Sequence, residues 1–144
     1  KTFAVITCLW PGVPLIYSGQ ELPLKKRLKF FDKDEIEWTA DLKLHEFYTL
    51  LLHVRKTHPV FEKGIRPVIV STDHDKVFVY MLANGAHKIF VLLNMSEENR
   101  LHVSIENELL PGSYMNLFSG LYHHFTNKEL FELQAWEYLV YCSG

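Results

Sequence analysis

The N-terminal part of the chain alternates apolar runs with polar segments. Residues 3–10 are almost continuously apolar and predict either the last turns of a helix or a buried strand, which Pro11 and Gly12 end. Residues 13–17 form a short apolar run between turn residues, the pattern of a strand that is buried on both faces of a parallel sheet. Residues 22–40 are polar and irregular, which predicts a long loop of the kind that carries functional residues on a rigid scaffold.

A helical pattern follows this loop. Asp41 is suited to the N-cap, the apolar residues after it recur at helical spacing, and His58–Pro59 end the pattern. We therefore expect one long amphipathic helix. Its buried face should hold Leu44, Phe47, Tyr48, Leu51 and Val54.

After Gly64 the hydrophobic period shifts to that of β-strands. The predicted strands are rich in Val, Ile, Phe and Tyr, and Asn84–Gly85 between two of them is a strong hairpin signal. The runs cover residues 66–71, 76–82, 87–94, 100–105, 113–118, 129–133 and 137–142. Short strands at this spacing predict an antiparallel β-sandwich. The chain is thus expected to be mainly β, with the sandwich over residues 58–144 and a separate, helix-containing unit over residues 1–57.

Composition and charge narrow the classes of partner. The chain has 144 residues, 48% of them hydrophobic, which is enough to bury a core without disulfide bonds. A formal charge of -2, with 15 basic and 17 acidic residues spread along the sequence, offers no patch for nucleic acid and no polybasic membrane anchor. We therefore expect neither partner. Cys8 and Cys142 are expected to be free thiols, largely buried.

The two ends of the chain differ. The first apolar element begins without a cap, so we expect that an N-terminal part is missing. Residues 136–144 complete a strand as a natural C-terminus would. The sequence predicts no compartment.

Motifs that would carry chemistry are incomplete. A zinc-protease helix needs a second histidine four residues after His45, where Thr49 stands. An esterase elbow needs glycines two residues before and two residues after its serine, but Ile16 and Gln20 stand there around Ser18. A calcium loop that starts at Asp32 would need glycine where Glu37 stands. We expect no metal site and no cofactor in this chain.

Aromatic residues of the sandwich have two explanations. They fill the core, which is the ordinary role of large aromatics in a domain of this size, or they offer a platform on which a sugar ring stacks. The residues concerned are Tyr114, Phe118, Tyr122 and Trp136. In the polar loop, Phe30 and Phe31 cannot both enter one core, so one of them should face a cleft or a missing neighbour. Asn94 lies in a glycosylation pattern but also at a strand end, where asparagine is ordinary.

The segment PGVPLIYSGQE, residues 11–21, resembles the segment that ends the (β/α)8 barrel of the α-amylase family, glycoside hydrolase family 13. In that family a helix runs into Pro-Gly-x-Pro, the eighth barrel strand follows with a tyrosine, and Gly-x-Glu closes it at the catalytic face. The positions that fit are Pro11, Gly12, Pro14, Tyr17, Gly19 and Glu21.

The resemblance continues along the chain. Residues 27–38 are similar to the Phe-Phe-x-Lys-Asp-x-Ile-x-Trp stretch of some amylases, and residues 44–56 to the eighth barrel helix with its terminal Leu-x-x-Arg-Lys. Residues 91–96 and 112–120 resemble central strands of the family's C-terminal domain. The resemblance implies that residues 1–57 are a remnant of the barrel, with its eighth strand, loop and helix. It implies that residues 58–144 are a Greek-key sandwich of the amylase C-terminal type.

The resemblance also implies a parent enzyme that cleaves α-linked glucans with retention. Its nucleophilic aspartate, acid/base glutamate and stabilising aspartate belong to earlier barrel strands, and a whole barrel takes about 250 residues. We therefore expect no catalytic residue in this chain, and we leave the calcium requirement of the parent open. The acidic residues of the loop do not replace the missing carboxylates, because a retaining pair must be held about 5 Å apart. These are Asp32, Asp34, Glu35 and Glu37.

Three functions remain open. In the first, the chain supports the missing barrel, Gln20 and Glu21 lie near the α-glucan cleft of the parent, and the unpaired run 13–17 makes the isolated chain self-associate. Glu21 could instead bind only backbone amides of its loop. In the second, the sandwich itself grips starch on two exposed rings, Tyr122 and Trp136. In the third, a naturally short protein serves as an interaction module.

Overall fold

The computed structural model describes residues 1–22, 24, 26–38, 44–62 and 65–144. Two α-helices and a 3-10 helix precede eight strands in this part of the chain. In order, they are α1 (Thr2–Leu9), α2 (His45–Thr57), η1 (Pro59–Phe61), β1 (Val68–Ile69), β2 (Val77–Asn84), β3 (His87–Asn94), β4 (Leu101–Glu106), β5 (Gly112–Asn116), β6 (Tyr122–Phe125), β7 (Lys128–Leu133) and β8 (Tyr138–Ser143).

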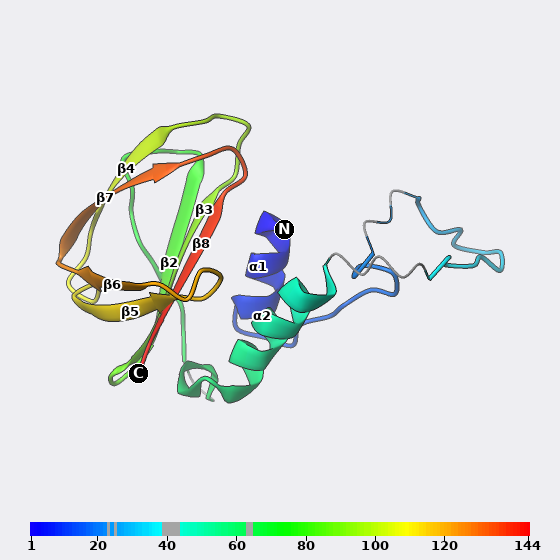
Figure 1. Cartoon of the computed structure of the whole chain (residues 1–144), viewed down its shortest axis with the longest axis horizontal. Coiled ribbons are helices and arrows are strands. Elements are labelled where there is room, and N and C mark those ends of the chain that lie inside the picture. The colour runs from blue at the N-terminus through cyan, green and yellow to red at the C-terminus, as the bar shows by residue number, and fades with distance from the viewer. Residues whose placement is uncertain (23, 25, 39–43, 63–64) are drawn as a thin grey trace.

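The strands form two antiparallel sheets, which confirms the mainly β sandwich. The larger sheet has the order β1-β2-β3-β8-β5-β6, and β4 pairs with β7 in the smaller sheet. An isolated bridge between Thr72 and Ile105 links the approach to β2 with β4. Figure 1 shows the sandwich on one side, with α1 and α2 beside the larger sheet. Strand β8, although last in sequence, is central in this sheet.

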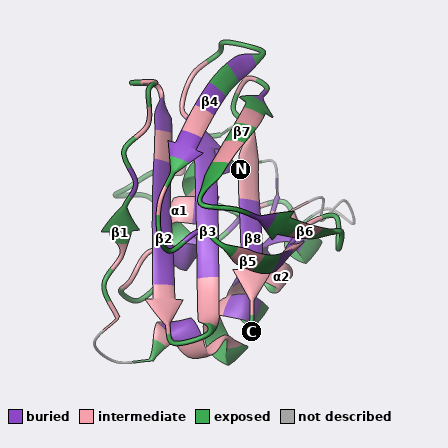
Figure 2. Cartoon of the chain, turned by 90° about the vertical axis from the view of Figure 1, so that its left-hand side faces the viewer, coloured by how far each residue is buried: buried purple, intermediate pink, exposed green. Residues whose placement is uncertain are grey.

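The larger sheet is covered on both faces. Along β2, Tyr80 and Leu82 belong to a core cluster with the helices, whereas Val79 and Met81 belong to a second cluster with the smaller sheet. Strand β3 is consequently buried from Ile89 to Asn94 without alternation. Figure 2 shows β2 and β3 largely buried, with β4 and β7 in front of the sheet and the helices behind it.

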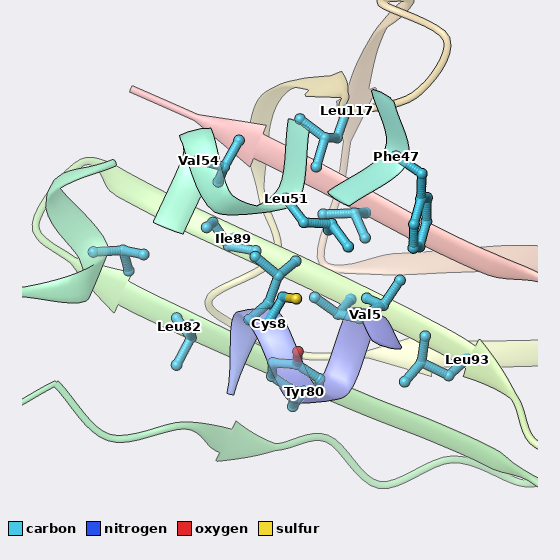
Figure 3. Close-up of a cluster of buried hydrophobic side chains, with 14 of the residues drawn as sticks. Val5, Cys8, Phe47, Leu51, Val54, Tyr80, Leu82, Ile89, Leu93 and Leu117 are labelled. Atoms are coloured by element: carbon cyan, nitrogen blue, oxygen red, sulfur yellow. The ribbon is translucent and has the colours of Figure 1, made fainter. Parts of the chain in front are cut away.

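Both helices pack their apolar faces onto the sheet. Helix α1 resolves the ambiguity over residues 3–10 in favour of a helix, with Val5, Cys8 and Leu9 buried. The expected face of α2 is confirmed, since four of its residues are buried and Leu44, just before it, is partly buried. Those four are Phe47, Tyr48, Leu51 and Val54, and Figure 3 shows three of them above Ile89 and Cys8. Asp41 lies outside the described residues. Among the described residues, no helix has the length and apolar character needed to cross a membrane.

The hairpin signal is confirmed, whereas one strand was missed. Asn84 pairs with His87, so Gly85–Ala86 form the two-residue turn, and Gly85 takes a φ of 61°, which glycine adopts at little cost. Strand β6 has too short an apolar pattern to stand out, because only Phe125 of its four residues is buried. It is held by pairing with β5.

The structure differs from the prediction of a buried strand over residues 13–17. This segment pairs with no strand of the described part of the chain, and Val13 is 96% exposed. A strand buried on both faces requires hydrogen-bonded neighbours and covering helices, and no described segment supplies them. The described residues 26–38 likewise extend away from the helices, to the right in Figure 1.

Candidate functional site

The predicted site residue Gln20 closes the turn that follows the 13–17 run. Its backbone N–H donates to the carbonyl oxygen of Tyr17 at 3.0 Å, and its Oε1 accepts from the Tyr17 N–H at 2.9 Å. Gly19 in the same turn has a φ of 87°, and a Cβ there would lie 3.3 Å from the side chains of Ile36 and Leu24. Glycine is favoured at this position by its conformation, whereas a Cβ would only push the ends of these two side chains slightly aside.

Glu21 joins this turn to the start of α2. Its carbonyl oxygen accepts from the Leu44 N–H at 3.2 Å, whereas its buried Oε2 has no hydrogen-bond partner among the described residues. Burial raises the pKa of Tyr48, and the nearby Cys8 and Glu21 raise it further. The Glu21 carboxylate is thus close enough to affect a residue on α2 electrostatically.

A hollow of about 660 Å³ opens between this turn, the following loop and α2. Gln20 lines it, together with apolar residues and the basic side chains of Lys26 and Arg27. The apolar members include Tyr17, Leu22, Leu24, Phe30 and Tyr48. Phe30 therefore faces a cavity, as expected for one of the two adjacent phenylalanines. Phe31 is 94% exposed, and the centres of the two rings lie 4.9 Å apart.

The acidic loop holds one organised carboxylate. Asp34 accepts hydrogen bonds from Lys26 Nζ, from the Lys29 N–H at 3.1 Å and from the Glu35 N–H at 2.9 Å. The Lys26 bond, the Lys29 amide and the Glu35 amide lower the pKa of Asp34, so this carboxylate is kept ionised in a structural role. Among the described residues, no three His, Cys, Asp or Glu side chains converge as metal ligands would.

The two aromatic candidates of the sandwich lie at opposite ends of β8. Tyr122 begins β6 and pairs with Met115, which pairs in turn with Cys142 near the end of β8. Trp136 precedes β8, and its backbone N–H donates to the Ser96 carbonyl at 3.0 Å. The centre of its ring lies 6.2 Å from that of the Phe3 ring. The structure does not bring the two rings together. Of the other two aromatics, Tyr114 is buried and Phe118 packs partly buried against α2.

Sequence reasoning missed the role of Arg55. Its Nη1 donates to the Trp10 carbonyl at 2.9 Å, its Nη2 donates to the Gly12 carbonyl, and its guanidinium lies 4.3 Å from the centre of the Phe61 ring. Arg55 thereby fixes the turn after α1 onto the last turn of α2. Two signals pointed to it: its position in a last helical turn, where cations are favoured, and its place in the Leu-x-x-Arg-Lys motif that ends this helix.

No protein-family model matches the sequence. The sequence is 27% identical over 121 residues to Alpha-amylase 2 of Dictyoglomus thermophilum, a match that covers 76% of this chain and 20% of that protein. This chain therefore spans a small part of its curated relative.

Solved structures of α-amylases share the fold. A noncanonic maltogenic α-amylase, AmyB, from Thermotoga neapolitana superimposes with a TM-score of 0.81 and 20% identity, over 99% of this chain and 35% of that one. An Anoxybacillus α-amylase superimposes with a TM-score of 0.72 and 18% identity, over 96% of this chain and 30% of that one. The chain is therefore similar, in sequence and in fold, to the C-terminal part of amylase-family proteins.

Proposed function

We propose that this chain is the C-terminal region of an α-amylase-type glycosidase that acts on α-glucans. In this proposal residues 1–57 complete a catalytic barrel, and residues 58–144 form a sandwich that supports it. The chain supplies none of the catalytic carboxylates and no cofactor, and its partner is the barrel of the same polypeptide.

The pattern of exposed and partly buried side chains in residues 13–17 is the main support for this proposal. Val13, Leu15 and Tyr17 are exposed, whereas Pro14 and Ile16 between them are partly buried. This alternation is that of a strand with one face covered. Large apolar side chains exposed side by side mark a surface that another structural element covers. The rest of the barrel, which packs on both faces of each of its strands, is the cover that the proposal supplies.

The contact between the helices and the sandwich supports the structural role. Val5, Cys8 and Leu51 share one buried cluster with Tyr80 and Ile89 of the sheet. The cluster fixes the direction in which residues 10–17 leave α1, and Arg55 fixes the turn itself. A sandwich fastened to the last barrel elements in this way would hold the final barrel strand in place.

Gln20 and Glu21 are proposed to lie near the substrate cleft of the complete enzyme. Both follow the 13–17 segment directly, and residues at the carboxyl end of a barrel strand line the active-site face. The buried Oε2 of Glu21, which has no partner among the described residues, supports a hydrogen-bond partner in the proposed barrel.

The proposal is tested by comparing the 144-residue chain with the protein encoded by the complete reading frame around it. We expect the complete protein to release reducing sugar from starch and the 144-residue chain to release none. Turnover by the 144-residue chain would refute the supporting role, and a complete protein without activity on any α-glucan would refute the glycosidase. A complete protein that carries Leu51→Ala should lose activity at a lower temperature, because a cavity in the shared core loosens the helices.

A further inference from the structure

The helices leave one strip of the larger sheet uncovered. Met115 pairs with both Cys142 and Tyr122, so these side chains lie on the sheet face that α2 covers. Alternation along β5 and β6 puts Ser113 and His124, another cross-strand pair, on the same face. Tyr122 is nevertheless 78% exposed, and Ser113 and His124 are exposed as well. The cover that α2 provides therefore stops before the β6 edge.

A hollow of about 410 Å³ lies where this strip meets the last turns of α2. We call it the β6-edge groove. One wall is formed by His53 and Thr57 of α2, the floor by Met115 and Cys142, and the opposite side by Ser113 and Tyr122. The groove thus places one exposed aromatic ring beside a row of hydroxyl and imidazole groups.

The lining of the groove combines apolar side chains, such as Val54, Met115 and Leu117, with uncharged polar ones. Lysine, arginine, aspartate and glutamate are absent from the described residues that line it. The available polar groups are side chains such as Ser113, whose Oγ lies 3.1 Å from His124 Nδ1, and Thr57, whose hydroxyl donates to the His53 carbonyl at 2.8 Å. Each hydroxyl oxygen keeps lone pairs that can accept a further hydrogen bond.

The groups of the groove are suited to binding rather than to catalysis. Burial raises the pKa of the Cys142 thiol to about 12, so this cysteine is not an activated nucleophile. His58, at the end of the groove, has both ring nitrogens occupied, by the Val60 N–H at 3.3 Å and the Ser143 carbonyl at 3.2 Å. It is therefore free neither to act as a base nor to bind a metal.

We propose that the β6-edge groove binds a neutral sugar chain, with one pyranose ring stacked on Tyr122 and its hydroxyl groups bonded to Ser113, Thr57 and His53. An aromatic face beside neutral donors and acceptors matches a pyranose, which has an apolar C–H face and a rim of hydroxyls. The inference rests on the proposed function for the choice of an α-linked glucan. It differs from a paired-ring platform, because Trp136 lies at the other end of β8 and takes no part.

Calorimetric titration of the 144-residue chain with maltoheptaose tests the groove. We expect saturable binding that weakens about tenfold in Tyr122→Ala, because the stacking surface is lost, and that is retained in Tyr122→Phe, because the ring is kept. Phe31→Ala is the matched control, since it also removes an exposed ring, but from the distant loop, and it should bind like the unmodified chain. Unfolding curves of all the variants should coincide, because the Tyr122 side chain is largely in solvent.

Three results would overturn the inference. These are the absence of saturable binding, equal affinity of Tyr122→Ala and the unmodified chain, and an affinity for a carboxylated oligogalacturonate that equals that for maltoheptaose. The titration measures binding and requires no turnover. If it shows no binding, the activity test of the complete protein can therefore still support the proposed function. An inactive complete protein whose C-terminal chain still binds maltoheptaose would refute the proposed function alone.

Discussion

Asn94 shows how much one side chain can organise. It is fully buried at the end of β3, and its Nδ2 donates to the carbonyls of Glu98 at 2.8 Å and Gln134 at 2.7 Å. Its Oδ1 accepts from the N–H of Ser96 at 3.0 Å and from the Ser96 hydroxyl at 2.7 Å. The amide therefore ties the loops after β3 and β7 together. Its glycosylation pattern has no use in this fold, because the nitrogen that would carry a glycan is buried and bonded.

We expect Asn94→Ala to lower the free energy of unfolding by about 2–4 kcal/mol, because it leaves several buried polar groups without partners. Urea unfolding at neutral pH measures the change. Asn127→Ala, at an exposed position, should alter the free energy by less than about 0.5 kcal/mol. Equal effects of the two substitutions would show that the hydrogen bonds of Asn94 do not stabilise the fold.

At the scale of elements, His58 joins the end of α2 to the sheet. Its Nδ1 accepts from the Val60 N–H, so the ring proton is on Nε2 and is donated to the Ser143 carbonyl. Protonation would place a second proton on Nδ1 and break the bond that caps η1. Burial lowers the pKa of His58, and the neighbouring His87 ring, 6.0 Å away, lowers it further, while the Ser143 carbonyl opposes the shift.

The expected pH dependence follows from this direction. Because the folded-state pKa of His58 is below the unfolded value of about 6.5, the unfolded chain takes up the proton first as pH falls. The contribution of His58 to the free energy of unfolding should therefore be fully present above about pH 6.5 and should decrease as the pH falls below this value. His58→Asn keeps an acceptor at the cap but removes the titrating group, so urea midpoints between pH 7 and pH 5 should fall less than in the unmodified chain. An unchanged slope in this variant would exclude His58 as the cause.

The sequence predicted an element correctly where its hydrophobic periodicity or its turn residues fitted one type of secondary structure only. Helix α2 has a regular apolar face, and Asn84–Gly85 has a turn chemistry that few other sequences provide. Residues 3–10 remained ambiguous, because a continuous apolar run looks the same in a buried helix and in a buried strand. Strand β6 was missed since its hydrogen bonds to β5, rather than apolar side chains, define it.

At the scale of the whole molecule, the sequence located the candidate residues but not their neighbours. Gln20 and Glu21 are adjacent in the chain, so their shared position next to the 660 Å³ hollow required little long-range information. Tyr122 and Trp136 were paired as exposed aromatics, yet their distance depends on strand order, which a single sequence does not encode locally. The same limit hid Arg55, whose partners lie before the long loop.

The exposed face of residues 13–17 predicts self-association of the isolated chain. Val13, Leu15 and Tyr17 present apolar surface without a covering partner in the described chain, and a second copy can cover it. Light scattering should therefore show a mass that rises with concentration, and Val13→Lys combined with Leu15→Lys should reduce it to that of a monomer.

Leu130→Lys is the control for this prediction, because Leu130 is also exposed but lies on β7. It should leave the association unchanged. A chain that stays monomeric at high concentration, or a control that dissociates as fully as the double variant, would contradict the assignment of the interface to residues 13–17.

The central place of β8 also determines when the molecule can form during synthesis. Residues 138–143 separate β3 from β5, and the Leu117 N–H donates to the Val140 carbonyl at 2.8 Å, so the sheet remains in two pieces until this strand has left the ribosome. Until then α1 and α2 lack part of the surface on which they rest, since Val140 belongs to their cluster. During synthesis the core shared by the two helices and the larger sheet is therefore expected to become complete only after β8 has been translated.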